Sequence, residues 1–176
     1  MYHTPRARPK LSPTVLQLLF KVIYEGALRV SEAIKLTDRD IIVEKQLIRL
    51  EGTKGTKKSK KKELREFAWV SEKTYSELVE HAAITPGLLF PVTRQTVWRW
   101  TKEIGEKVGI ELIHKAKDTK NLTVHTLRHF RAIHLLDGGF KVHELMKKLR
   151  HRSLEPTTTY TEISNEDVRK REAQIT

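Results

Sequence analysis

The most compact group of residues that could do chemistry in this 176-residue sequence is HTLRH, at residues 125–129. Positions three apart on a helix share a face, so His125 and Arg128 could direct an imidazole and a guanidinium at one spot. Arginine can bond two phosphate oxygens at once, and a histidine near its reference pKa can exchange a proton beside them. The pattern indicates a phosphate-sized site, but taken alone this spacing usually belongs to surface or core-edge residues.

A second group is LRHRSLEPTTTY, at residues 149–160, which joins His151 to Tyr160 across a turn and a new helix. Pro156 suits the first turn of that helix. Three threonines before Tyr160 disfavour a rigid helix, because β-branched side chains lose rotamer freedom there. A mobile phenol is easier to deliver to a substrate, whereas the alternative is an ordinary, partly buried tyrosine.

Two further groups carry positive charge. GALRVSEAIKL, at residues 26–36, embeds Arg29 among residues that pack, so this arginine needs an anion. Glu32 could supply it as a structural ion pair, and we take that as the default. TKGTKKSKKK, at residues 53–62, holds six lysines, which suit either a solvated turn or a loop that follows a nucleic-acid backbone.

Apolar spacing predicts the elements that must position these groups. Helices are expected from Pro13 to Gly26 and over 30–36, 71–83, 93–108, 125–136, 142–149 and 156–163, and strands over 41–43, 47–50 and 64–70. Ser71 is expected to cap its helix, with Thr74 at the third following position. The expected fold is α+β, mainly α-helical, with a small antiparallel sheet.

Composition favours a polyanionic partner. The formal net charge is +12 and the sequence pI is about 9.9, which is typical of proteins that bind nucleic acid. Double-stranded DNA is the expected ligand, without a membrane partner, because no apolar run approaches the length of a span. The absence of cysteine excludes disulfides and thiolate metal sites. A cytoplasmic protein with one domain is expected.

Together and in this order, the four groups resemble the tyrosine recombinase family of phage integrases and Xer-type recombinases. The family's first box is matched by residues 27–32, its GKGxK hairpin by residues 52–55, and its HxLRH box by residues 125–129. Its LGHxS…TTxxY element is matched by residues 149–160. Ala27 and Arg150 stand where the family usually has glycine, and one residue is inserted before Lys54.

The resemblance implies a tyrosine recombinase catalytic-domain fold and a metal-free reaction without a cofactor. Tyr160 would be the nucleophile, Arg29 and Arg128 would stabilise charge on the phosphate, and His125 and His151 would add hydrogen bonds. Lys54 would protonate the departing 5′ oxygen, with Lys57 or Lys58 as alternatives. The wider DNA contacts are expected from residues of the lysine-rich loop and the segment around His151: Lys57, Lys58, Lys60, Arg150 and Arg152.

The expected domain layout is a basic arm or linker remnant at 1–11, a catalytic domain at 12–163 and a charged tail at 164–176. Family members usually carry an additional N-terminal DNA-clamping domain, so we expect a fragment or a minimal recombinase that binds DNA weakly and with strong salt dependence. Self-association on DNA, as a synaptic tetramer in the family, is also expected. Two alternatives stay open: a type IB topoisomerase-like enzyme that relaxes DNA, and a catalytically inactive DNA-binding relative.

Overall fold

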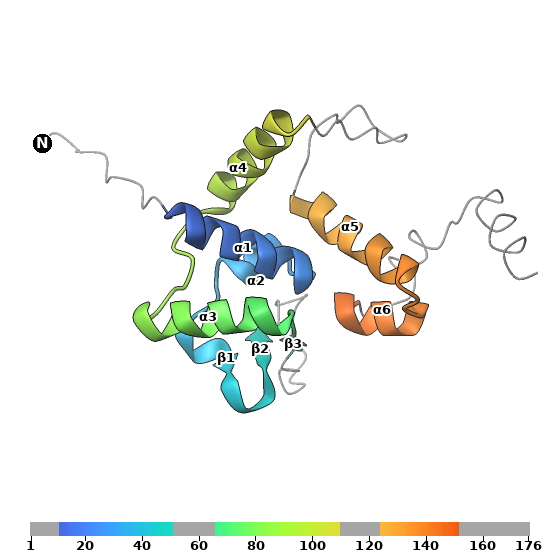
Figure 1. Cartoon of the computed structure of the whole chain (residues 1–176), viewed down its shortest axis with the longest axis horizontal. Helices are drawn as coiled ribbons and strands as arrows, with labels where there is room; N and C mark the ends of the chain where they lie inside the picture. Colours follow the sequence, from blue (N-terminus) through green and yellow to red (C-terminus); the bar gives the residue numbers. More distant parts are fainter. Residues whose placement is uncertain (1–10, 51–65, 110–123, 152–176) are drawn as a thin grey trace, which may run out of the picture. The chain divides into compact units, whose positions relative to one another are not determined.

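This computed structural model describes residues 11–50, 66–109 and 124–151. The chain forms two compact units, residues 1–128 and 129–176, so the division falls inside one helix. In chain order, the elements drawn in Figure 1 are α1 (Pro13–Glu25), α2 (Val30–Ala33), β1 (Ile41–Ile42), β2 (Leu47–Leu50), β3 (Glu66–Ala68), α3 (Glu72–Ile84), α4 (Arg94–Lys107), α5 (Val124–Asp137) and α6 (Val142–Leu149). The predicted helix at 156–163 lies outside the described residues.

The start of α1 is set by local chemistry. Ser12 adopts an extended backbone and its hydroxyl accepts a hydrogen bond from the Val15 N–H at 3.3 Å. Pro13 takes the first helical position, where its missing N–H is of no consequence. The apolar stripe of the helix, formed by Leu18, Leu19, Val22 and Ile23, is buried. The predicted helix is confirmed, including its apolar face.

The end of α1 is a Schellman motif, a closure in which one residue takes the left-handed (αL) conformation and two N–H groups bond back to the last turn. Ala27 is the left-handed residue, with φ of 47°. Its N–H donates to the Tyr24 carbonyl at 3.1 Å, and the Leu28 N–H donates to the Ile23 carbonyl at 2.9 Å. Gly26 precedes it because a Cβ there would lie 2.7 Å from the Val22 carbonyl oxygen.

The sheet is antiparallel, with strand order β1-β2-β3. Ile41 pairs with Ile48, and Ile48 in turn pairs with Ala68. The first strand is shorter than the predicted 41–43, because Val43 begins a 3-10 helix (Val43–Lys45). Gln46 then turns the chain with φ of 51°, and Leu47 directly after it pairs with Ile42.

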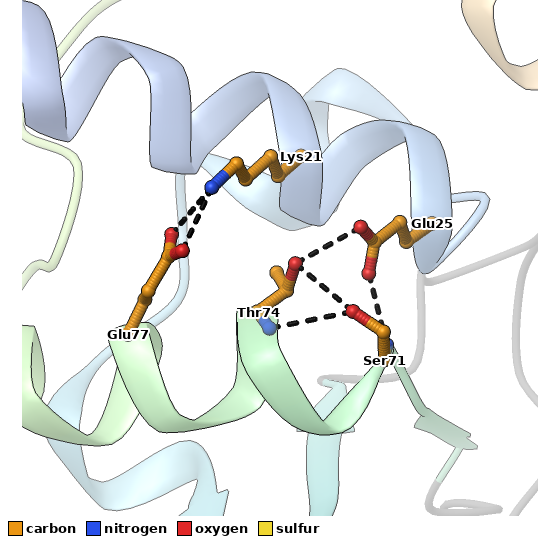
Figure 2. Close-up of polar contacts among 5 residues, drawn as sticks. All are labelled: Lys21, Glu25, Ser71, Thr74 and Glu77. Carbon is orange, nitrogen blue, oxygen red and sulfur yellow. Dashed lines mark hydrogen bonds and ion pairs between the residues drawn. The ribbon is translucent and has the colours of Figure 1, made fainter.

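Helices α1 and α3 lie antiparallel to each other, as their polar contacts show (Figure 2). Lys21 Nζ lies 2.8 Å from the Glu77 carboxylate. One turn further along α1, Glu25 accepts hydrogen bonds from the Ser71 backbone N–H and the Thr74 hydroxyl, each at 2.9 Å. Ser71 also caps α3 by accepting the Thr74 N–H, as predicted. The start of α3 is therefore fixed to the end of α1.

The core of the first unit combines these helices with the sheet. Its buried members come from helices α1 to α5 and strands β2 and β3 and the turns beside them, and include Leu19, Ile23, Leu28, Ile48, Leu78, Phe90 and Val97. Helix α2 is only four residues long, which is shorter than the predicted 30–36, and Ile34 caps it. Leu36 is buried as expected, and its carbonyl accepts the Leu89 N–H at 2.9 Å instead of continuing the helix.

The second unit holds the later part of α5 and all of α6. Gly139, with φ of 89°, closes α5 through a second Schellman motif, in which the Phe140 N–H donates to the Leu135 carbonyl at 2.9 Å. Among the described residues of this unit, the buried apolar side chains are Ala132, Leu135, Leu145 and Leu149. The described residues are thus mostly helical with one small antiparallel sheet, which confirms the predicted class.

Candidate functional site

Arg29 stands at the junction of α1 and α2. Leu28, between the Schellman turn and Arg29, is fully buried and anchors this elbow in the core. Arg29 itself is the N-cap of α2, with an extended backbone at φ of −71° and ψ of 146°. Its side chain keeps 35% of its surface exposed, so the guanidinium can also reach a ligand.

Glu32 binds both the backbone and the side chain of Arg29. One carboxylate oxygen accepts the Arg29 backbone N–H at 2.7 Å, and the other accepts Nη1 of the Arg29 side chain at 2.7 Å. The Glu32 side chain is 2% exposed, so this charge is removed from water and depends on its partners. The ion pair expected by default from the sequence is present, and it orients the arginine without covering it.

Arg128 reaches the same elbow from α5. The residue is 5% exposed, and its Nη1 donates a hydrogen bond to the Ala27 carbonyl at 2.5 Å. A hydrogen bond from a charged donor is stronger than one between neutral groups. The left-handed turn at Ala27 therefore supplies the acceptor that positions the second arginine.

His125 lies one turn before Arg128 on α5, and its side chain is exposed. Its pKa is lowered from the ordinary value of 6.5, first because nearby protein atoms reduce its hydration, and then because of the positive charges of Arg94, Arg128 and Arg29. An imidazole with a lowered pKa is neutral at pH 7 and can accept a proton. In the first unit, His125 thus lies near the positive charges of the arginines at 29 and 128.

Arg94 is the member of this group that the sequence reasoning missed. It is the first residue of α4, directly after the N-cap Thr93, and it is exposed. The available signal was a cation at a helix N-terminus whose first turn has no acidic residue. Chemically, three guanidinium groups and a neutral imidazole can bind an oxyanion and stabilise added negative charge on it.

His151 and Arg150 belong to the second unit. Arg150 ends α6 in a third Schellman motif: it has φ of 56°, its N–H donates to the Lys147 carbonyl, and the His151 N–H donates to the Met146 carbonyl, both at 3.1 Å. Arginine here adopts the backbone that the glycine of the family pattern would adopt. The replacement therefore leaves the turn before His151 intact.

Several predicted site residues lie outside the described residues: Lys54, Lys57, Lys58, Lys60, Arg152 and Tyr160. Within residues 11–50, 66–109 and 124–151, no group of three His, Cys, Asp or Glu side chains could hold a metal ion. The same part of the chain contains no helix that is long and apolar enough to cross a membrane.

A model of the phage integrase family matches residues 1–167. The chain belongs to the phage integrase family. Two relatives are named tyrosine recombinases. XerD of Corynebacterium glutamicum is 30% identical to this chain, over 86% of this chain and 49% of the relative. XerA of Thermococcus onnurineus is 31% identical, over 88% of this chain and 53% of the relative. This phage integrase family member therefore spans about half the length of these curated relatives.

Solved structures share the fold of this integrase-family chain. The crystal structure of XerA recombinase superposes with a TM-score of 0.66 at 22% identity, over 97% of this chain and 66% of that one. The catalytic domain of bacteriophage HP1 integrase gives a TM-score of 0.59 at 18% identity, over 93% and 92%. XerH site-specific recombinase bound to difH substrate gives 0.68 at 19% identity, over 94% and 48%. These matches confirm the predicted catalytic-domain fold.

Proposed function

We propose that this chain is the catalytic domain of a site-specific DNA recombinase, which cleaves and rejoins strands through a covalent link to Tyr160. The observation that carries the proposal is the group formed by Arg29, Arg128 and His125: two guanidinium groups, both held by protein acceptors, beside an exposed imidazole with a lowered pKa. Family membership supports it, since the relatives are named tyrosine recombinases.

In the proposed cleavage step, the Tyr160 oxygen attacks the phosphorus of one phosphodiester as its O–H proton passes to a base. A bond from phosphorus to the phenolic oxygen forms, and the bond to the 5′ oxygen breaks. Lys54 protonates the departing oxygen, or Lys57 or Lys58 does so if the inserted residue shifts the hairpin. One phosphodiester bond is exchanged for another, the bond to Tyr160, so the energy of the broken bond is kept. Attack by a 5′ hydroxyl on this bond therefore reverses the step without an external energy source.

Arg29 and Arg128, each hydrogen-bonded to a protein acceptor, can stabilise the negative charge that develops on the phosphate in this reaction. Arg29 and Arg128 would bind the non-bridging oxygens of the pentavalent transition state, where a preorganised donor is worth about 3–4 kcal/mol. A free phenol has a pKa of about 10, so Tyr160 needs a base at neutral pH. His125 suits this role because its lowered pKa keeps it neutral and able to accept a proton. His151 would donate a further hydrogen bond to the phosphate.

Double-stranded DNA is the proposed substrate. The formal net charge of +12 favours it, and XerH was solved bound to difH substrate. Lys57, Lys58, Lys60, Arg150 and Arg152 are proposed as backbone contacts, with self-association on DNA. The relatives are named tyrosine recombinases, which does not favour a DNA-relaxing enzyme of the topoisomerase IB class or an inactive DNA-binding relative.

Trapping a covalent protein–DNA adduct tests this function. A sequence enriched by the protein from a random pool is built into a nicked suicide duplex, whose short cleaved piece diffuses away and prevents rejoining. Wild type should form an adduct that resists denaturant, Tyr160→Phe should form none, and peptide mapping should find the nucleotide on Tyr160. An adduct that persists in Tyr160→Phe would refute the assignment, and its absence from both proteins would favour the inactive binder.

A further inference from the structure

Two groups at the start of α3 donate hydrogen bonds to Glu25, the last residue of α1 (Figure 2). One carboxylate oxygen accepts the Ser71 backbone N–H, and the other accepts the Thr74 hydroxyl, each at 2.9 Å. Ser71 is the N-cap of α3, and Thr74 is 2% exposed. The Ser71 hydroxyl in turn donates to the Thr74 hydroxyl at 3.2 Å. Glu25 therefore binds two donors that are themselves held in place.

The charge of Glu25 is better placed for α3 than for its own helix. A carboxylate in the last turn of a helix faces the negative end of the helix dipole, and the last turn of α1 has no basic residue to offset it. At the start of α3 the dipole is positive, so the same carboxylate is stabilised there. Glu25 therefore contributes to the junction of the two helices and not to the stability of α1 alone.

This junction adjoins the turn that carries both arginines of the candidate site. Ala27 follows Glu25 by two residues, and its carbonyl accepts the hydrogen bond from Arg128. Arg29 follows Glu25 by four residues and begins α2 as its N-cap. The backbone hydrogen bonds of the Schellman motif tie residues 27 and 28 to the last turns of α1. A movement of the end of α1 would therefore move the Ala27 carbonyl and Arg29 together.

We propose that Glu25 is a positioning residue for Arg29 and Arg128: by holding the turn at Ala27 against the start of α3, it sets where the two guanidinium groups meet the phosphate. The proposal rests on the proposed function. Apolar packing has no directional preference, whereas hydrogen bonds do, so the bonds of Glu25 set the position of the turn more closely than the core around it does. Glu25 itself would touch neither DNA nor the reacting atoms.

The first experiment measures the rate of adduct formation on the suicide duplex at saturating protein. Glu25→Gln replaces one acceptor oxygen with an amide nitrogen that cannot accept, and we expect it to react about tenfold more slowly, since a misplacement of about 1 Å can cost about a hundredfold. Its affinity for DNA should be unchanged. Thr74→Val removes one donor and keeps the shape of the side chain, so it should give a smaller loss.

The matched control is Glu77→Gln. It removes the ion pair with Lys21, which joins the same two helices one turn earlier along α1. Because this pair lies farther from the turn at Ala27, the control should react at the wild-type rate. Thermal midpoints of all four proteins show that each is folded at the temperature of the assay.

Two modified duplexes show how the loss arises. A methylphosphonate at the cleaved position replaces one non-bridging oxygen with a methyl group and removes the negative charge that the arginines stabilise. On this duplex Glu25→Gln and wild type should react within about twofold of each other, because misplaced arginines then matter less. A second duplex has sulfur in place of the departing 5′ oxygen, and a thiolate leaves without being protonated. There the difference between the two proteins should persist.

Amide hydrogen exchange measures the hold on the turn without DNA. In Glu25→Gln, the N–H groups of Ala27 and Leu28, which close the Schellman motif, should exchange about tenfold faster than in wild type, because the turn opens more often. The amide of Leu19, in the middle of α1, should exchange at the wild-type rate. Glu77→Gln should leave all three amides unchanged.

The outcomes separate the two proposals. If Glu25→Gln and Glu77→Gln slow the reaction equally, or if neither does, Glu25 is not a positioning residue while the recombinase function stands. If the sulfur leaving group cancels the loss, Glu25 acts on protonation of the 5′ oxygen and not through the arginines, which also refutes the proposal. If wild type forms no adduct, the proposed function fails, and exchange at Ala27 and Leu28 alone then decides whether Glu25 holds the turn.

Discussion

The guanidinium of Arg128 is hydrogen-bonded to the backbone carbonyl of Ala27, across 101 positions of sequence. Ala27 lies two residues before Arg29, so one bond links the segments that carry both arginines of the candidate site. The acceptor faces Arg128 in a turn that takes the left-handed conformation. The geometry of the site therefore depends on the backbone at Ala27 more than on its methyl group.

Substitutions of Ala27 should separate these two contributions. Ala27→Val should lower the unfolding free energy by about 2–4 kcal/mol, because a β-branched residue is strained at positive φ and overfills a buried position. Ala27→Gly should change it by less than about 1 kcal/mol, since relief of strain offsets the lost methyl and the greater chain entropy. Urea unfolding measures both values. Equal destabilisation by the two substitutions would show that the methyl group, not the backbone, matters.

Glu32→Gln tests whether the carboxylate holds Arg29. The amide can still accept one hydrogen bond but loses the charge opposite the guanidinium, and we expect a loss of about 1–2 kcal/mol of stability, less than for a fully buried pair because Arg29 is partly exposed. The adduct rate on a suicide duplex should also fall. The matched control is Glu103→Gln, which removes an exposed pair with Arg99 and should change stability by about 0.5 kcal/mol or less. Equal effects of the two substitutions would argue against a special role for Glu32.

The pKa of His125 offers a direct electrostatic test. In the free protein it should lie below 6.5, because reduced hydration and the charges of Arg94, Arg128 and Arg29 disfavour the protonated ring. Arg94→Gln should raise it, and added DNA should raise it further because phosphate offsets the positive charge. NMR titration of the ring protons measures these values, with His125→Gln to assign the signal. A pKa above 6.5 in the free protein would contradict the described surroundings.

The same shift has a consequence for stability against pH. As the pH falls below about 6.5, the unfolded chain takes up a proton at His125 before the folded chain does. His125 therefore destabilises the folded state progressively below that value, until the pH reaches the lower pKa of the folded protein. Unfolding curves of wild type and His125→Gln should diverge as the pH falls through this window, with the variant losing less stability. Parallel curves would show that the shift is absent.

Arg150→Gly should restore the residue that the resemblance leads one to expect. Arg150 has φ of 56°, where an L-residue is strained and glycine is not, so the variant should gain about 0.5–1 kcal/mol of stability. If Arg150 also binds DNA, the Arg150→Gly variant should bind DNA more weakly than wild type although it is more stable. Thermal unfolding and a salt titration of DNA binding measure the two effects, and a loss of stability would contradict the assigned strain.

Much of the fold could be predicted because the signals are local. Ser12 and Ser71 cap their helices, Gly26 and Gly139 mark helix ends, and apolar periodicity gave the buried face of α1. The errors lie where tertiary contacts decide. Helix α2 stops after four residues because the chain at Leu36 bonds to Leu89 instead, and no short-range pattern contains that information.

In the candidate site, too, local spacing could be predicted from the sequence, whereas contacts made by tertiary packing could not. His125 and Arg128 share a helix, so their spacing predicted their proximity, and Glu32 lies three residues from its partner Arg29. Arg94 could not be found by spacing, because it reaches the group only when α4 packs on α2. The hydrogen bond from Arg128 to a main-chain carbonyl was also unpredictable, since any residue type can supply that acceptor.

The left-handed closures of α1, α5 and α6 use alanine, glycine and arginine at the equivalent position. Two main-chain hydrogen bonds hold each turn, so the torsion survives a change of side chain at a modest energetic penalty. A search pattern that demands glycine before the first arginine or before the last histidine will therefore discard true relatives of this chain. Profiles that score helix-end geometry in place of residue identity would recover them.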